Sequence, residues 1–247
     1  MPVERVLILG GTGEARALAA ALVAAGHDVT TSLAGVTAQP ILPEGKIHVG
    51  GFGGVEGLRA YLAQEKISVV IDGTHPFAAI ISRNAAAASG TVPLLRLERP
   101  AWLPRHGDHW IDVSDISGAV DALSVHAKVL LTIGRKEILP FISRSDLSGV
   151  ARMIEAPPLA LPETWTLVLQ RPPFAVADEV ALMRKHDITH VISKNAGGTE
   201  TFAKLVAARQ LRIPVVMVQR PVKPAVPGYA TVAACLEAVS QLGRGKR

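Results

Sequence analysis

The sequence predicts an α/β protein made of two Rossmann-like domains, each with a doubly wound parallel sheet, and with a cleft between them. Short apolar runs, which are typical of buried parallel strands, alternate with Ala- and Leu-rich helical stretches along the chain. Several of these runs end in loops that contain glycine. The alternation stops at a proline-containing segment, residues 99–104, and then starts again. This restart indicates two domains, which we place at residues 1–104 and 105–247.

The first half supplies a regular series of strands and helices. The apolar run 6–9 leads into glycines, and the helical pattern that follows ends at Gly26, a residue type that commonly terminates helices. By the same criteria, strands are expected at 6–9, 29–33, 47–49, 68–71 and 92–95, and helices at 14–25, 55–66 and 82–89.

The second half repeats this pattern with little sequence similarity to the first. Its strands are expected at 110–113, 129–133, 150–154, 166–169, 189–193 and 215–219, and its helices at 178–186, 199–208 and 231–242. The order along the chain leaves one alternative open, in which a strand near the boundary completes the sheet of the other half.

Composition limits the classes of function. Of the 247 residues, 49% are apolar and only 19% are charged, which is enough for a large core. The net charge of +5 is dispersed, without the basic stripe and stacking aromatic residues of a nucleic-acid-binding protein. No apolar run approaches the ~18 residues of a membrane span, and the N-terminus does not resemble a signal peptide. With its single cysteine, Cys235, in an apolar helical pattern, the chain is expected in the cytoplasm, without a disulfide, a membrane or a nucleic-acid partner.

The loop after the first strand is the first candidate binding site. Between this strand and the helix lie Gly10, Gly11, Thr12, Gly13 and Glu14. Glycines let a ligand approach the backbone, and a helix N-terminus attracts anions. The fingerprint G-x-G-x-x-G is incomplete, since Arg16 stands where the last glycine is expected. We assign the loop to a cofactor; the alternative is a tight turn in which Thr12 caps the helix.

The end of the second strand bears on which nicotinamide cofactor is used. Rossmann sites for NAD usually place Asp or Glu here to bind the ribose hydroxyls. Residues 30–35 instead read Thr-Thr-Ser-Leu-Ala-Gly, with no acidic residue. Small and hydroxyl side chains, among them Ser32, are compatible with the 2′-phosphate of NADPH, which we therefore favour. No arginine follows at once, and Arg16 is the candidate to reach that phosphate.

The fourth strand ends in the sequence Asp-Gly-Thr-His-Pro-Phe-Ala, residues 72–78. This loop is expected at the same carboxyl edge of the sheet as the first loop. His75 is the best-placed proton donor, because histidine titrates near neutral pH, and Thr74 is assigned to the cofactor site. In the alternative interpretation, Thr74 caps a helix and His75 is an ordinary loop residue. The other histidines and Cys235 lack the spacing of metal ligands, so no metal is expected.

Further cations and glycines mark candidate sites for anions. Arg99 lies in a basic, proline-stiffened segment that serves either as a plain linker or as a partner for carboxylates. After the strands at 129–133 and 189–193, two loops combine glycine with positive charge. The residues assigned to substrate or phosphate binding are Arg99, Gly134, Arg135, Ser193, Lys194, Asn195, Gly197 and Gly198.

Taken in order, these stretches resemble the precorrin-6A reductase family over nearly the whole chain. The resemblance rests on LGGTGEA at 9–15, DGTHPFA at 72–78, RPAW at 99–102, Gly134-Arg135 and ISKNAGG at 192–198, with Lys204 and Arg220-Pro221 further on. It implies hydride transfer from NADPH to one C=C bond of precorrin-6A, an acidic tetrapyrrole of cobalamin biosynthesis, giving precorrin-6B. The substrate's acidic side chains are consistent with the arginines and lysines noted above. Neighbouring enzymes of the pathway are the other partners that the resemblance suggests.

Two other functions stay open at this point. A short-chain dehydrogenase is another NADP-dependent oxidoreductase, but it needs a Tyr-x-x-x-Lys pair, whereas Tyr61 is followed by Glu65 and Tyr229 by Ala233. A non-enzymatic sensor module would bind NADP but no macrocycle. A spectroscopic titration with a precorrin separates the sensor from the enzyme.

Overall fold

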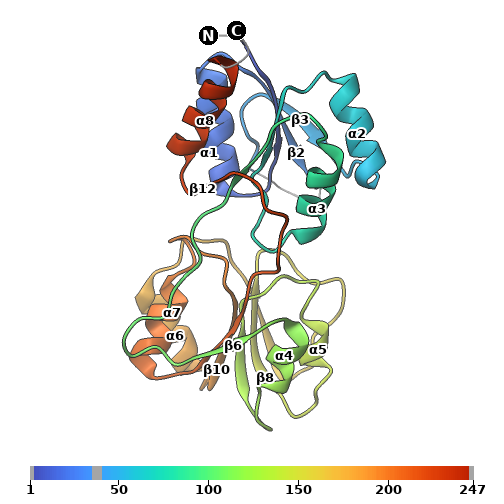
Figure 1. Ribbon diagram of the computed structural model, residues 1–247. Coiled ribbons are helices and arrows are strands. Elements are labelled where there is room, and N and C mark those ends of the chain that lie inside the picture. Colours follow the sequence, from blue (N-terminus) through green and yellow to red (C-terminus); the bar gives the residue numbers. More distant parts are fainter. Residues whose placement is uncertain (1–2, 35–40, 245–247) are drawn as a thin grey trace. The chain divides into compact units, whose positions relative to one another are not determined.

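The protein is described by a computed structural model that covers residues 3–34 and 41–244. This part of the chain contains two parallel sheets of six strands each (Figure 1). The chain divides into two compact units, of which the first is Met1–Pro100 with Pro221–Arg247 and the second is Ala101–Arg220. The predicted fold class, two Rossmann-like α/β units with parallel sheets, is therefore confirmed.

The first unit has its strands in the order β12-β5-β4-β1-β2-β3. Its central strand β1 pairs with β2 on one side and with β4 on the other. The elements are β1 (Arg5–Leu9), α1 (Gly13–Ala24), β2 (Asp28–Leu33), β3 (Lys46–Val49), α2 (Gly54–Gln64), β4 (Val69–Asp72), α3 (Ala79–Ala88), β5 (Leu94–Leu97), β12 (Gly228–Tyr229) and α8 (Val232–Arg244).

Both faces of this sheet are covered, which explains why β1 is apolar throughout. Val6 and Ile8 pack in one core cluster with residues of α1 and α8, whereas Leu7 and Leu9 pack in another with residues of α2 and α3. Figure 1 shows α1 beside α8 and α2 beside α3. Cys235 of α8 is fully buried, and burial raises the pKa of its thiol to about 11, as expected for a cysteine that serves only packing.

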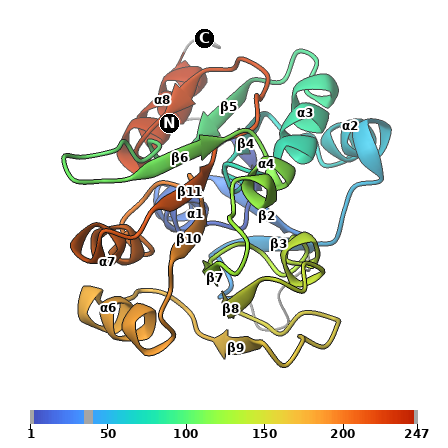
Figure 2. The same cartoon turned by 90° about the horizontal axis from the view of Figure 1, so that it is seen from below.

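The second unit repeats the architecture, with the order β6-β11-β10-β7-β8-β9. Figure 2 shows α6 and α7 on one face of this sheet and α4 and α5 on the other. The elements are β6 (Trp110–Val113), α4 (Ile116–Asp121), β7 (Lys128–Leu131), α5 (Leu139–Ile142), β8 (Ser148–Met153), β9 (Trp165–Leu169), α6 (Val176–Lys185), β10 (His190–Lys194), α7 (Ala203–Leu211) and β11 (Val215–Val218).

The sixth strand of each sheet departs from the order along the chain. Strand β6 follows β5 in sequence, yet it pairs with β11 in the second sheet. Strand β12, close to the C-terminus, pairs with β5 in the first sheet. The expectation that residues 105–247 form the second domain is therefore corrected, because Pro221–Arg247 belongs to the first unit. The strands next to the predicted boundary, β5 and β6, each stay in their own half, and it is instead the C-terminal strand β12 that completes the sheet of the other half.

Most expected elements are found with shifts of one to three residues at their ends. The short helices α4 and α5 and the two-residue strand β12 were not expected. Helix α7 begins at Ala203 rather than at residue 199, since residues 199–202 form turns. Among the described helices, none has the length and apolar character needed to cross a membrane.

Candidate functional site

The loops after β1 and β4 lie next to each other at the carboxyl edge of the first sheet. Strands β1 and β4 are neighbours, and the chain leaves them in opposite directions, toward β2 and β5. Such a reversal of strand order is the usual ligand-binding position in open parallel sheets. The two loops are joined by a hydrogen bond from Thr12 Oγ1 to the carbonyl oxygen of Gly73, at 2.8 Å. The sequence-predicted cofactor residues of both loops are therefore brought together.

The first loop has the backbone properties expected of an anion-binding turn. Thr12 caps α1, since its Oγ1 accepts the N–H of Ala15 at 3.1 Å. Gly11 has a φ of +116°, which favours glycine. Gly10 lies close to β2, where a Cβ would be 2.6 Å from Cγ2 of Thr31. Among the described residues, no acceptor is found for the N–H groups of Gly11, Thr12 and Gly13, so these donors remain for a ligand. Capping and ligand binding, treated as alternatives in the sequence, are thus compatible.

The second loop is held by a buried carboxylate. Asp72 Oδ1 accepts hydrogen bonds from Thr74 Oγ1 at 2.6 Å and from Thr74 N at 3.3 Å, and Oδ2 accepts from Arg96 Nε at 3.2 Å. Burial by itself raises the pKa of Asp72, but hydrogen bonds from Ser82 and Thr74 and the charge of Lys223 outweigh it, so this pKa lies below its ordinary value. Both donors of Thr74, its hydroxyl and its backbone N–H, are thereby committed to Asp72, and only its oxygen acceptors remain for a cofactor.

His75 is half-buried and has a defined ring orientation. Its Nδ1 accepts the N–H of Phe77 at 3.3 Å. A ring nitrogen that accepts carries no proton, so in the neutral ring the proton is on Nε2. Lys223 lies nearby, with Nζ 3.4 Å from the carbonyl oxygen of His75 and 2.8 Å from Oε2 of Glu98. Lys223 was not predicted as a site residue, because 148 residues separate it from His75 in sequence.

Two predicted residues of the first unit form an ion pair. Arg99 Nη1 lies 2.8 Å from Glu14 Oε2 and 3.1 Å from Oε1. Glu14 is in the first turn of α1, where Arg99 compensates its negative charge. Ser32 is buried at the end of β2, and its carbonyl oxygen accepts the N–H of Gly10 at 2.9 Å. Gly35, which the prediction for this strand end included, lies outside the described residues.

The second sheet brings its predicted residues together at the equivalent position, where β7 and β10 are neighbours. Lys194, the last residue of β10, forms an ion pair with Glu137, which follows the Gly134-Arg135 turn after β7. Arg135 pairs with Glu155, with Nη1 3.1 Å from Oε2. Both predicted cations are therefore held by carboxylates from neighbouring loops. Glu137 was not predicted, since nothing in the sequence places it beside Lys194.

Other predicted residues of this loop serve the fold. The Asn195 side chain is buried; its Oδ1 accepts the N–H of Trp102 at 2.8 Å, and its Nδ2 donates to the Trp102 carbonyl at 3.1 Å. Ser193 is also buried and donates to the Lys194 carbonyl at 3.2 Å. Gly197 and Gly198 have φ values of 70° and 80°, which favour glycine. Because α7 starts only at Ala203, this loop does not present a helix N-terminus, contrary to the expectation for residue 199.

Nearly the whole chain matches a known protein family. Residues 5–240 match the family model described as "Precorrin-6x reductase CbiJ/CobK". The chain belongs to this reductase family. Members carry out reduction, which implies a nicotinamide cofactor, and this reductase shares the family's fold.

Similar proteins match almost from end to end. The precorrin-6A reductase of Rhodococcus erythropolis is 46% identical over 97% of both chains, and that of Mycobacterium tuberculosis H37Rv is 47% identical over 92% of this chain and 93% of its own. The cobalt-precorrin-6A reductase of Priestia megaterium is 30% identical, over 87% of this chain and 90% of its own. A solved structure of CobK precorrin-6A reductase, 40% identical, matches 98% of both chains with a TM-score of 0.91.

Proposed function

We propose that this chain reduces one C=C bond of precorrin-6A, giving precorrin-6B, with NADPH as the hydride donor. The observation that carries the proposal is the pair of joined loops after β1 and β4, in a chain of the precorrin-6x reductase family. NADPH supplies a hydride to one carbon of the double bond, and a proton is added to its neighbour. The protein's own residues bind, orient and neutralise the two reactants.

The first loop fits the diphosphate of a dinucleotide. Its free N–H groups, at the start of the 12-residue helix α1, are donors of the kind that bind phosphate oxygens. A side chain at Gly11 would be strained by its positive φ. Gly10 to Gly13 would hold the diphosphate, and the nearby end of β2 would hold the ribose of the adenosine.

NADPH is favoured over NADH by the end of β2. Strand β2 runs beside β1 with Leu9 opposite Ser32, so the residues that follow Ser32 are adjacent to the first loop. Thr31, Ser32 and Leu33 carry no negative charge. A carboxylate at this position binds ribose hydroxyls and repels a 2′-phosphate, and here it is missing from the described residues of the strand.

His75 is the candidate proton donor. The acid is the imidazolium form of His75, and loss of one ring proton gives the neutral ring, in which Nδ1 accepts the Phe77 N–H. His75 follows directly on the Asp72–Thr74 turn, so the buried carboxylate fixes the backbone from which the ring projects. After proton transfer the ring is reprotonated by solvent.

The cations of the second unit fit the acidic side chains of the substrate. Lys194 forms an ion pair with Glu137 and Arg135 forms one with Glu155, and a substrate carboxylate would compete with or extend these pairs. We propose a metal-free substrate, because relatives named precorrin-6A reductase reach 47% identity, whereas those named cobalt-precorrin-6A reductase reach 33%.

The function is tested by anaerobic incubation with precorrin-6A and either NADPH or NADH. We expect NADPH oxidation together with a change in the absorbance of the macrocycle, and little reaction with cobalt-precorrin-6A. Gly11→Ala should lose NADPH affinity. Its matched control is Gly26→Ala, which imposes the same positive-φ strain at the end of α1, far in sequence from the loop. An unchanged macrocycle spectrum, with NADPH bound but not oxidised, would indicate a binding protein instead.

A further inference from the structure

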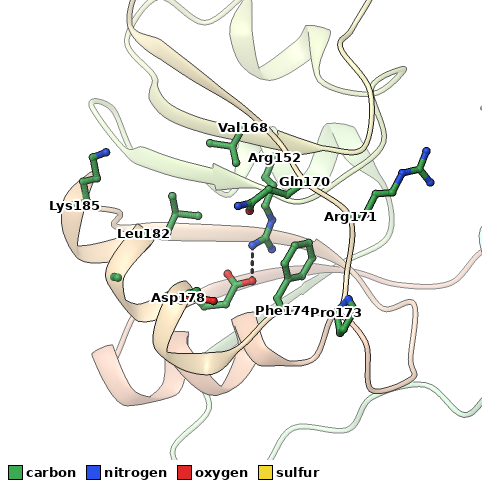
Figure 3. A pocket seen from close by; sticks show the side chains of 11 residues that line it. Arg152, Val168, Gln170, Arg171, Pro173, Phe174, Asp178, Leu182 and Lys185 are labelled. Atoms are coloured by element: carbon green, nitrogen blue, oxygen red, sulfur yellow. Dashed lines mark hydrogen bonds and ion pairs between the residues drawn. The ribbon is translucent and has the colours of Figure 1, made fainter. Parts of the chain in front are cut away.

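A pocket in the second unit is lined by none of the residues assigned to a site so far. It has a volume of about 460 Å³ and lies among β8, β9, the segment that follows β9, and α6 (Figure 3). Its lining residues are Arg152, Val168, Gln170, Arg171, Pro173, Phe174, Asp178, Glu179, Ala181, Leu182 and Lys185.

The pocket contains a buried arginine. Arg152 lies in β8 opposite Val168 of β9, and its side chain is only 5% exposed. A guanidinium keeps its charge when buried, so it needs a partner. This partner is Glu179 in the first turn of α6, and the dashed line that starts at Arg152 in Figure 3 marks the ion pair. The Phe174 ring centroid lies 3.9 Å from the Arg152 guanidinium carbon and adds a cation–π contact.

This ion pair leaves hydrogen-bonding capacity unused inside the pocket. Glu179 is 1% exposed, and its second oxygen, Oε2, is buried without a hydrogen-bond partner. Arg152 donates one hydrogen bond among the described residues, to Glu179 Oε1, although a guanidinium has five N–H groups. Buried polar groups are normally satisfied by protein, water or a ligand. Both a donor and an acceptor are therefore available to a bound molecule.

The buried charges next to the pocket are predominantly positive. Lys204 of α7 is 3% exposed, and its Nζ donates to the Thr201 carbonyl at 2.8 Å. Burial lowers the pKa of Lys204 to about 7; the charge of Arg152 acts in the same direction, and that of Glu179 opposes it. Two buried basic side chains, Arg152 and Lys204, thus lie within electrostatic range of a single buried carboxylate, that of Glu179. Such a cluster is stabilised by an added negative charge.

The remaining walls define the shape of the ligand. Val168, Leu182 and Phe174 form apolar walls of the pocket. Its polar lining consists of Gln170, the exposed cations Lys185 and Arg171 and the exposed carboxylate of Asp178. We propose that this pocket binds a carboxylate carried on a short apolar arm. The Arg152 guanidinium lies between the ligand carboxylate and Glu179.

Such a carboxylate has two sources, an acidic side chain of the tetrapyrrole or a free small carboxylic acid. Binding of a carboxylate, the group that both sources have in common, is tested first. Butyrate is titrated into the protein, and the methyl NMR signals of Val168 and Leu182 report binding. We expect saturable shifts with butyrate and none with butyramide, its neutral analogue. This binding experiment involves no reduction, so its outcome does not depend on the function proposed above.

The key variant is Gln170→Glu, which changes an exposed residue isosterically and adds a negative charge to the pocket. It should weaken butyrate binding by about tenfold. Gln210→Glu is the matched control, since Gln210 is an exposed residue of α7 that does not line the pocket. Arg152→Lys should also weaken butyrate binding. If this variant does not fold, the comparison of Gln170→Glu with Gln210→Glu still tests the proposal. Equal affinity in the two glutamate variants, or no methyl shift with butyrate, would overturn the proposal.

A second titration identifies the natural source. Precorrin-6A is added in the presence of NADP⁺, where no reduction occurs. If Gln170→Glu weakens precorrin-6A binding by a similar factor, a side chain of the tetrapyrrole occupies the pocket. If only butyrate binding is weakened, the pocket takes a free carboxylic acid. Both outcomes support the carboxylate site.

Discussion

The Arg99 guanidinium lies 2.8 Å from the Glu14 carboxylate, in the first turn of the helix that follows the glycine-rich loop. An acidic residue next to a diphosphate site repels the ligand, and Arg99 removes most of this repulsion. Arg99→Met should therefore weaken NADPH binding by about 1 kcal/mol, a modest value because both side chains are partly exposed. Isothermal titration would measure this, and the double variant Glu14→Gln/Arg99→Met should recover the affinity. No recovery in the double variant would mean that Arg99 contacts the cofactor itself.

We expect a strong preference for NADPH, because the described end of β2 carries no carboxylate. The kcat/KM values for NADPH and NADH measure this preference. Ser32→Asp should reduce the preference by about tenfold or more, through repulsion of the 2′-phosphate. Ser32→Ala, which removes the hydroxyl without adding charge, should leave most of it intact. Equal kcat/KM values for NADPH and NADH in the unaltered protein would show that the end of β2 does not select NADPH.

Lys194 and Glu137 should have opposite effects on substrate binding. Lys194→Ala removes a cation and leaves the Glu137 charge uncompensated, so the affinity for precorrin-6A should fall by about 1.5–3 kcal/mol. Glu137→Gln removes a negative charge that competes with the substrate for Lys194 and should lower KM. Thermal unfolding of both variants provides the control. A sharp fall in Tm with unchanged affinity per folded molecule would show that the pair is structural.

His75→Ala should slow single-turnover reduction by about 10² or more, the lower end of typical general-acid contributions, with little change in NADPH affinity. The rate of the unaltered protein should also depend on pH through one ionisation near neutrality. The exposed His106 is the matched control, since His106→Ala removes the same group outside the loop. A His75→Ala rate within a few-fold of the unaltered protein would identify solvent as the proton donor.

Asp72 should stabilise the protein in a pH-dependent manner. Its pKa is lowered in the folded state, so its contribution is fully present above its unfolded pKa, about 3.9, and is lost as the pH falls through the folded value. Asp72→Asn should reduce the free energy of unfolding at pH 7 by about 1.5–3 kcal/mol, and this difference should shrink in acid. Denaturant unfolding from pH 7 to pH 3 measures both. A difference that is independent of pH would contradict the lowered pKa of Asp72 in the folded state.

Candidate site residues could be predicted where a single loop contains the whole sequence pattern. They could not be predicted where the site is formed by segments that are distant in sequence. Gly11 and Thr12 were predicted because a glycine-rich turn between an apolar strand and a helix is typical of a phosphate-binding loop. Lys223 and Glu137 were missed because their positions depend on loops far away in sequence. Asn195 was assigned to ligand binding because it stands in one loop with Lys194 and two glycines. Its side chain bonds to the Trp102 backbone, a partner that no local pattern reveals.

The sequence by itself determined the two α/β units, the strands that form their centres and the loops at their carboxyl edges. These features follow from local apolar periodicity and from the backbone needs of glycine turns. Only the tertiary structure decided that β12 joins the first sheet and that β6 lies at the edge of the second sheet beside β11. Strand β12 has two residues, and β6 forms its single pairing with β11, so neither has a long apolar pattern that specifies a partner. The unpaired backbone groups at a sheet edge can hydrogen-bond to any strand that runs in the right direction. The packing of β12 and α8 on the first unit therefore determines which sheet β12 joins.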